Sequence, residues 1–95
     1  MSEPQTSYWS AEIQVRLKPS VNDPQGLSIR GALRSLGFGV DDVRAGKLIE
    51  VRFAAADRDA AQRSVERMCE QLLANPVIET YRFTLSAIDA PVPAP

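Results

Sequence analysis

The stretch Ala11-Glu12-Ile13-Gln14-Val15-Arg16-Leu17-Lys18 alternates apolar and polar side chains without a break. This period of two is typical of a β-strand with one buried face and one face in water. Pro19 follows and is expected to end the strand, because proline cannot donate to a strand ladder. A sheet built on such a strand needs apolar cover on one face only, and amphipathic helices can supply that cover.

The segment after this strand predicts a helix from Pro24 to about Leu36. Asp23 is placed to cap it, and Pro24 takes the first helical position, where a missing N–H costs nothing. Gly37 suits the left-handed residue that commonly follows the end of a helix. The apolar residues recur at helical spacing and form one stripe: Ile29, Ala32, Leu33 and Leu36.

A second helix is predicted to begin after Asp57 and to end at Asn75-Pro76. Cys69 lies beside its apolar stripe and is expected at the edge of the core. A last strand follows, with Tyr81, Phe83 and Leu85 facing inward. The stripe of this second helix consists of four residues: Ala61, Val65, Met68 and Leu72.

The run from Val40 to Ala55 has strand character and allows two interpretations. Gly46-Lys47 forms a tight turn between a short strand and a longer one, or the run is a single bent strand with a bulge at Gly46. The unbroken alternation from Val43 to Phe53 mildly favours the single strand. The sequence leaves both open.

The expected order of elements is β-α-β(β)-α-β. We therefore predict an α+β fold: a small antiparallel sheet of three to four strands with two helices on one face, related to the ferredoxin-like fold. Residues 10–86 are expected to form a single domain. Residues 1–8 are polar with one proline, and residues 87–95 carry three prolines, so we expect a disordered N-terminus over residues 1–9 and a disordered proline-rich tail over residues 87–95.

Composition excludes several kinds of site. The 95 residues include no histidine and one cysteine, so the chain cannot assemble a Ser–His or Cys–His pair, a zinc site of Cys and His ligands, or an intrachain disulfide. A net charge of −1 argues against nucleic-acid binding. The chain has no apolar run of membrane-spanning length and no secretory signal pattern. We therefore expect a soluble cytoplasmic protein with no membrane partner.

Two segments outside the expected core are candidate partner-binding sites. The first is Asp23-Pro24-Gln25-Gly26, a helix start that could hold an anion or a partner's backbone or could simply be a cap. The second contains Arg44, Gly46 and Lys47 and is either a basic tip or a solvated turn. Leu48 is the one apolar residue expected on the open face of the sheet, and a subunit contact there would explain it.

Three separated motifs together resemble the PurS family, the small subunit of phosphoribosylformylglycinamidine (FGAM) synthase. They are Val21–Gly26, then Val43–Lys47 leading into Ile49-Glu50-Val51, and Met68–Tyr81. Their order and spacing also match, and the resemblance covers roughly residues 11–86.

This resemblance implies a non-catalytic, cofactor-free subunit of a complex in de novo purine (IMP) biosynthesis. PurS-like chains form homodimers that bridge a glutaminase subunit and a large synthetase subunit, which uses ATP and Mg, and they assist ammonia transfer between them. The alternative is a stand-alone ligand-binding regulatory module of ferredoxin-like type. An RNA-binding domain is disfavoured, because the expected open face lacks an aromatic stack.

Overall fold

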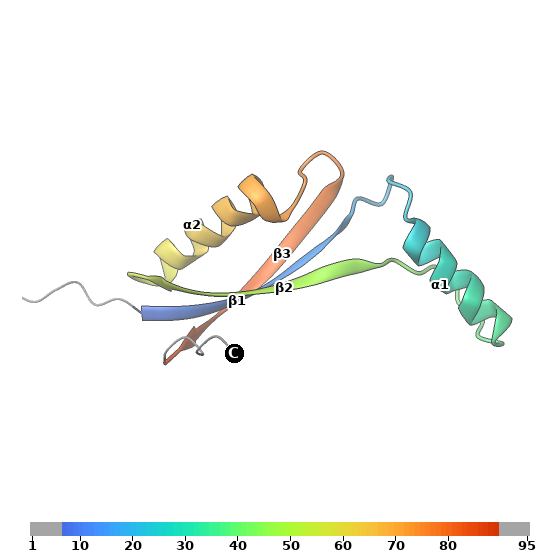
Figure 1. The fold of residues 1–95 in the computed structure, drawn as a ribbon, viewed down its shortest axis with the longest axis horizontal. Coiled ribbons are helices and arrows are strands. Elements are labelled where there is room, and N and C mark those ends of the chain that lie inside the picture. Colours follow the sequence, from blue (N-terminus) through green and yellow to red (C-terminus); the bar gives the residue numbers. More distant parts are fainter. Residues whose placement is uncertain (1–6, 90–95) are drawn as a thin grey trace, which may run out of the picture.

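A computed structural model of the chain describes residues 7–89 (Figure 1). The elements in chain order are β1 (Ser7–Leu17), α1 (Pro24–Ser35), β2 (Gly46–Ala55), α2 (Arg58–Met68), the π-helix η1 (Cys69–Leu73) and β3 (Glu79–Ile88). The strands form one sheet in the order β2-β1-β3, and both neighbours run antiparallel to β1. The predicted α+β class with a small antiparallel sheet is confirmed.

The central strand β1 at its start and the outer strand β3 at its end extend the sheet beyond the expected domain limits. Ser7 pairs with Ala55, and Tyr8 lies between Ala54 and Ile88, so the expectation of disorder is wrong for residues 7–9 and for residues 87–88. Pairing with a neighbouring strand satisfies backbone hydrogen-bonding groups of these residues and holds them in place. The disorder expected for residues 1–6 and 90–95 lies outside the described residues.

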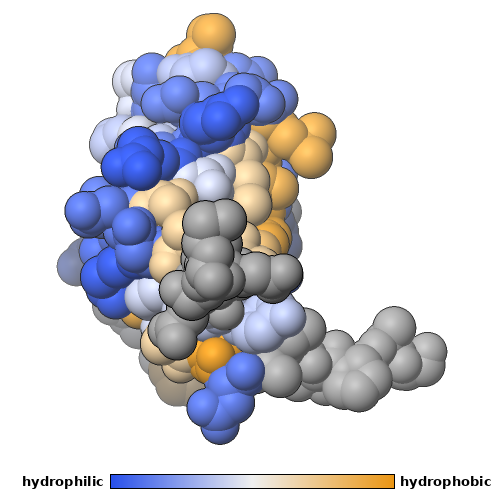
Figure 2. All heavy atoms as spheres, turned by 90° about the vertical axis from the view of Figure 1, so that its left-hand side faces the viewer, coloured by the Kyte–Doolittle hydropathy of each residue, from blue (hydrophilic) through white to orange (hydrophobic). Residues whose placement is uncertain are grey.

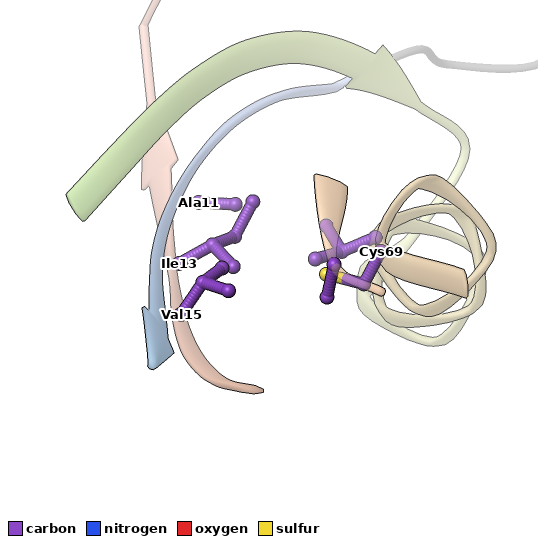
Figure 3. Close-up of a cluster of buried hydrophobic side chains, with 6 residues drawn as sticks. Ala11, Ile13, Val15 and Cys69 are labelled. Atoms are coloured by element: carbon purple, nitrogen blue, oxygen red, sulfur yellow. The ribbon is translucent and has the colours of Figure 1, made fainter. Parts of the chain in front are cut away.

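The core lies between β1 and the α2–η1 segment. Ala11, Ile13 and Val15 point from β1 towards Cys69 (Figure 3), and each of these four side chains is at most 1% exposed. Ile13 sits between Ile49 of β2 and Phe83 of β3. The alternation along β1 is thus confirmed. Val65 and Ala74 complete the buried cluster, and half-buried side chains surround it: Ile49, Val51, Phe53, Leu73, Tyr81, Phe83 and Leu85.

The segment before β2 matches neither interpretation of residues 40–55. β2 begins at Gly46, opposite Arg16, and residues 40–45 have no regular secondary structure. The reason is a contact with a distant part of the sequence, because the backbone N–H of Ala45 donates to the Asp23 carboxylate instead of to a neighbouring strand. Alternation alone could not reveal this competing bond.

Within residues 7–89, α2 and η1 cover the sheet and α1 does not, so the expectation of two helices on one face is wrong for α1. α1 projects beyond the end of the sheet (Figure 1), and Gly26 is its one buried residue. The radius of gyration is 17.9 Å, whereas about 12 Å is typical of a compact chain of this length. The apolar stripe of α1 therefore has little cover within its own chain.

The C-terminal end of α1 follows the prediction closely. Gly37 has a φ of +96°, and its N–H donates to Arg34 O, while the N–H of Phe38 donates to Leu33 O. These two bonds form a Schellman motif.

The π-helix η1 changes which side chains α2 buries. The N–H of Ala74 donates to Cys69 O across five residues, which is π-helical rather than α-helical spacing. The wider turn rotates the following residues, so Leu72 is 82% exposed although its spacing placed it on the buried stripe. Cys69, expected at the core edge, is fully buried instead.

Candidate functional site

The first candidate segment forms a junction that fixes α1 to the end of the sheet. Asp23, the N-cap of α1, is only 5% exposed. Its Oδ1 accepts from the N–H of Gly26 at 3.0 Å, and its Oδ2 accepts from the N–H of Ala45 at 2.8 Å. One carboxylate thereby ties the start of α1 to the segment that leads into β2. We call Asp23, Gly26, Arg44 and Ala45 the α1 junction.

Arg44 and Gly26 complete this junction. Arg44 Nη2 donates to Lys18 O at 2.9 Å and lies 3.3 Å from both Leu17 O and Val21 O. Gly26 approaches Val43 O so closely that a β-carbon at this position would clash with that oxygen. The sequence motifs at 23–26 and 44–45 thus meet in space, and they hold the chain's own backbone.

The remaining candidate residues are exposed. Pro24 and Gln25 lie in the first turn of α1, while Lys47 and Leu48 begin β2. Lys47 Nζ lies 4.0 Å from Glu79 Oε2, and Leu48 is 63% exposed on the open face. A β-carbon at Gly46 would lie 2.6 Å from Val15 O. Of the eight candidates, Asp23 and Gly26 are buried, and Arg44 is exposed but donates to backbone oxygens of its own chain, so these four exposed side chains are the best placed to contact a partner.

We expect the α1 junction to depend on pH. The N–H groups of Gly26 and Ala45 lower the pKa of the Asp23 carboxyl, burial opposes them, and Arg44 lowers it further. Because the folded-state pKa lies below the unfolded value of about 3.9, the stabilisation is complete above that pH and is lost as pH falls through the folded-state pKa. Urea unfolding of wild type and Asp23→Asn between pH 6 and pH 2 should show a stability difference that shrinks only at the acidic end. A difference that stays constant down to pH 2 contradicts this role.

Sequence reasoning missed the largest exposed apolar surfaces. Figure 2 shows apolar residues exposed next to strongly hydrophilic ones on one side of the molecule. Helical spacing had assigned Ile29, Leu36 and Leu72 to a buried core, yet all three are exposed. Helical spacing offers no signal here, because a stripe covered within its own chain and an exposed stripe have the same period. The exposed large apolar side chains are these: Leu27, Ile29, Leu36, Phe38, Leu48, Leu72, Val77 and Ile78.

Residues 7–89 contain no cluster of three or more His, Cys, Asp or Glu side chains that could hold a metal ion. Burial raises the pKa of the Cys69 thiol, and Glu70 and Glu66 raise it further, which makes the thiol a poor nucleophile. None of the helices in this range is long and apolar enough to span a membrane.

The comparisons with known proteins agree on one family. The sequence model of PurS, described as phosphoribosylformylglycinamidine (FGAM) synthase, matches residues 10–87. The chain is similar to the phosphoribosylformylglycinamidine synthase subunit PurS of Synechocystis sp., with 44% identity over 85 residues, or 88% of this chain and 85% of that protein. It is similar to the same subunit of Bacillus subtilis, with 43% identity over 83 residues, or 86% and 98% of the two chains.

The fold supports the same assignment. A chain in the structure of PurLQS from Thermotoga maritima superimposes with a TM-score of 0.76 at 33% identity, and the match covers 85% of this chain and 98% of that one. The order and spacing of the three sequence motifs, the three-strand sheet and these matches all agree. The chain belongs to the PurS family of FGAM synthase subunits.

Proposed function

We propose that this chain is the non-catalytic small subunit of FGAM synthase in purine biosynthesis, and that it bridges the glutaminase and the ATP-dependent synthetase subunits in the cytoplasm. Membership of the PurS family and the similarity to a chain of PurLQS support this proposal. The observation that carries it is the extent of exposed apolar surface on a small chain: Leu36 is 74% exposed and Leu72 is 82% exposed. Surfaces of this kind mark protein–protein contacts.

The residues support an adaptor better than a catalyst. The chain has no histidine, and the thiol of Cys69 is buried with a raised pKa. The reaction needs a nucleophile in the glutaminase and a site for ATP and Mg in the synthetase, and both belong to the larger subunits in this proposal. The small subunit binds no cofactor.

In this proposal, the small subunit contributes to ammonia transfer by closing the contacts between subunits to water. Ammonia attacks through its lone pair, so protonation to ammonium in water abolishes its reactivity. A passage closed by apolar contacts keeps it unprotonated until it reaches the activated substrate. A small folded adaptor with exposed leucines can supply such apolar contacts.

A homodimer is the second part of the proposal. Small domains bury a low fraction of their surface and depend on association for further stability. α1 contributes only Gly26 to the buried residues, so a second copy has apolar surface to cover.

The bridging role is tested with residues at the exposed start of β2. We expect Lys47→Ala with Leu48→Ala to reduce co-purification with the glutaminase and synthetase subunits by about tenfold, equivalent to about 1.4 kcal/mol of binding free energy. These side chains are exposed, so the fold is preserved and circular dichroism should be unchanged.

The matched control is Glu50→Ala with Arg52→Ala, a pair of exposed side chains that contact each other farther along the face of β2 that carries Leu48. It should co-purify like wild type. Arg44 is unsuitable for this test, because its substitution removes bonds to three backbone carbonyls. Undiminished co-purification of the Lys47/Leu48 variant excludes the start of β2 from the partner surface.

A further inference from the structure

We propose that the open face of the sheet, at the end from which α1 projects (Figure 1), docks an acidic segment of a partner subunit. The segment carries an Asp or Glu side chain beside an apolar one. This inference rests on the bridging function proposed above and adds the chemistry of one contact. The site consists of Arg16, Arg44 and Lys47, which we call the basic corner, and of Leu48 beside them.

Two adjoining hollows form the site, and both are lined by Arg16 and Arg44. The first has a volume of about 550 Å³, and its lining includes Thr80 and Asp42. Arg16 is exposed on the open face, in register with Thr80 of β3 on one side and with Gly46 of β2 on the other. Because glycine has no side chain, the β2 position opposite Arg16 leaves space beside the guanidinium.

Arg44 is held in position before any partner binds. Its three hydrogen bonds, to the backbone oxygens of residues 17, 18 and 21, all come from Nη2. Its Nε and Nη1 make no hydrogen bond within residues 7–89. The guanidinium therefore keeps its structural role and still has donors for a carboxylate, and little side-chain entropy is lost when it binds one.

The positive charge of the basic corner is poorly balanced within the chain. Among residues 7–89, no carboxylate forms a salt bridge with Arg16 or Arg44, and Lys47 Nζ is 4.0 Å from Glu79 Oε2. Of the described residues that line the two hollows, Asp42 is the one acidic side chain. The whole chain has a net charge of −1, so this excess is local. Arginine binds carboxylates through paired, charge-assisted hydrogen bonds, which makes an acidic side chain the matching ligand.

An exposed leucine gives the site an apolar side. The second hollow has a volume of about 270 Å³, and Lys47 and Leu48 belong to its lining. Leu48 is 63% exposed. Contacts at an interface are strongest where surrounding side chains shield them from water, so the segment needs an apolar side chain next to its carboxylate.

The shape of the site favours a protein segment over a small molecule. Sites for small ligands bury about 70–90% of the ligand's surface, whereas five of the six residues that line the first hollow are exposed. A protein segment covers the site with its own surroundings as it binds. A second copy of this chain is a poor occupant, because a two-fold contact of the basic corner with itself brings like charges together.

Two substitutions with opposite expected effects test the site in the full-length chain. Arg16→Glu should weaken binding to the purified glutaminase and synthetase subunits by about tenfold. Asp42→Asn removes the carboxylate that competes with the segment and should tighten binding by about threefold, a gain that damage to the fold cannot produce. Titration of the fluorescently labelled chain with the two subunits, followed by anisotropy, gives the affinities.

The matched control is Arg63→Glu, which makes the same change of charge at an exposed position on α2. It should change the affinity by less than about twofold, because α2 covers the opposite face of the sheet and exposed charges are screened over about 8 Å at physiological salt. An equal loss of affinity in Arg16→Glu and Arg63→Glu overturns the site. Circular dichroism checks that each variant is folded.

A cross-link identifies the occupant. Benzophenone maleimide attached to Thr80→Cys places a photoreactive group in the first hollow, while Cys69 is fully buried and does not react. After irradiation of the assembled complex, mass spectrometry should find the probe on a segment of the glutaminase or the synthetase that has an Asp or Glu next to an apolar residue.

The outcomes separate this inference from the function it rests on. If the wild-type chain binds the two subunits and Arg16→Glu and Asp42→Asn bind equally well, the docking site is wrong and the bridging function stands. A cross-link that is absent, that joins two copies of this chain or that reaches a segment without an acidic residue also overturns the site. A wild-type chain that binds neither subunit overturns the function and the site together.

Discussion

Ile13→Ala is expected to lower the free energy of unfolding by about 2–5 kcal/mol. Ile13 is fully buried on the central strand, between Ile49 and Phe83, and it faces Cys69 across the core. Removing its outer carbons leaves a cavity that β1 cannot close, because β1 is paired on both edges. Domains have only about 5–15 kcal/mol of net stability, so this variant should unfold at much lower urea concentrations.

Leu48→Ala is the matched control for this prediction. It also deletes a branched aliphatic side chain from a strand, but Leu48 is 63% exposed, so the change should stay within about 0.5 kcal/mol. Urea unfolding followed by circular dichroism measures both variants. Equal losses for Ile13→Ala and Leu48→Ala contradict the placement of the core.

Gly26→Ala and Gly31→Ala are expected to change stability in opposite directions. A β-carbon on Gly26 meets Val43 O and the Asp23 carboxylate, so the substitution should cost about 1–3 kcal/mol. The same carbon on Gly31 meets nothing within 4 Å in the middle of α1. There alanine should add about 0.5–1 kcal/mol by restricting the unfolded chain and favouring the helix.

Comparing the two variants isolates the contribution of the α1 junction to stability, because both variants add one methyl group to the same helix. Thermal and urea unfolding give the two free energies, and amide hydrogen exchange in α1 shows whether the helix itself is released. A Gly26→Ala variant as stable as wild type means that the close approach to Val43 is not a constraint.

Local sequence patterns were sufficient to predict the elements whose limits are set by neighbouring residues in the sequence. Alternation located β1 and its buried side, and capping chemistry located the starts of both helices at Asp23 and Asp57, each of which accepts an N–H three residues ahead. Gly37 marked the end of α1, as its positive φ confirms. These signals act within a few residues and need no tertiary contact.

The errors arose where distant contacts decide the structure. The Asp23 bond to Ala45 spans 22 residues and removes residues 40–45 from the strand. The π-turn at Cys69 shifts the buried side of α2 and exposes Leu72. Periodicity identified an apolar stripe on α1 but not that the stripe is largely exposed beyond the end of the sheet. For the same reason, the motifs at 23–26 and 44–47 were recognisable as a site, while the structural roles of Asp23, Gly26, Arg44 and Ala45 were not.

Reconstitution of FGAM synthase tests the central claim most directly. The glutaminase and synthetase subunits are assayed with ATP and substrate, with glutamine or with free ammonia as the nitrogen source, in the presence and absence of this chain. We expect glutamine-dependent synthesis to fall to background without the chain and to return when it is added, while ammonia-dependent synthesis persists in both cases. Glutamine-dependent synthesis that proceeds equally well without the chain would contradict the account.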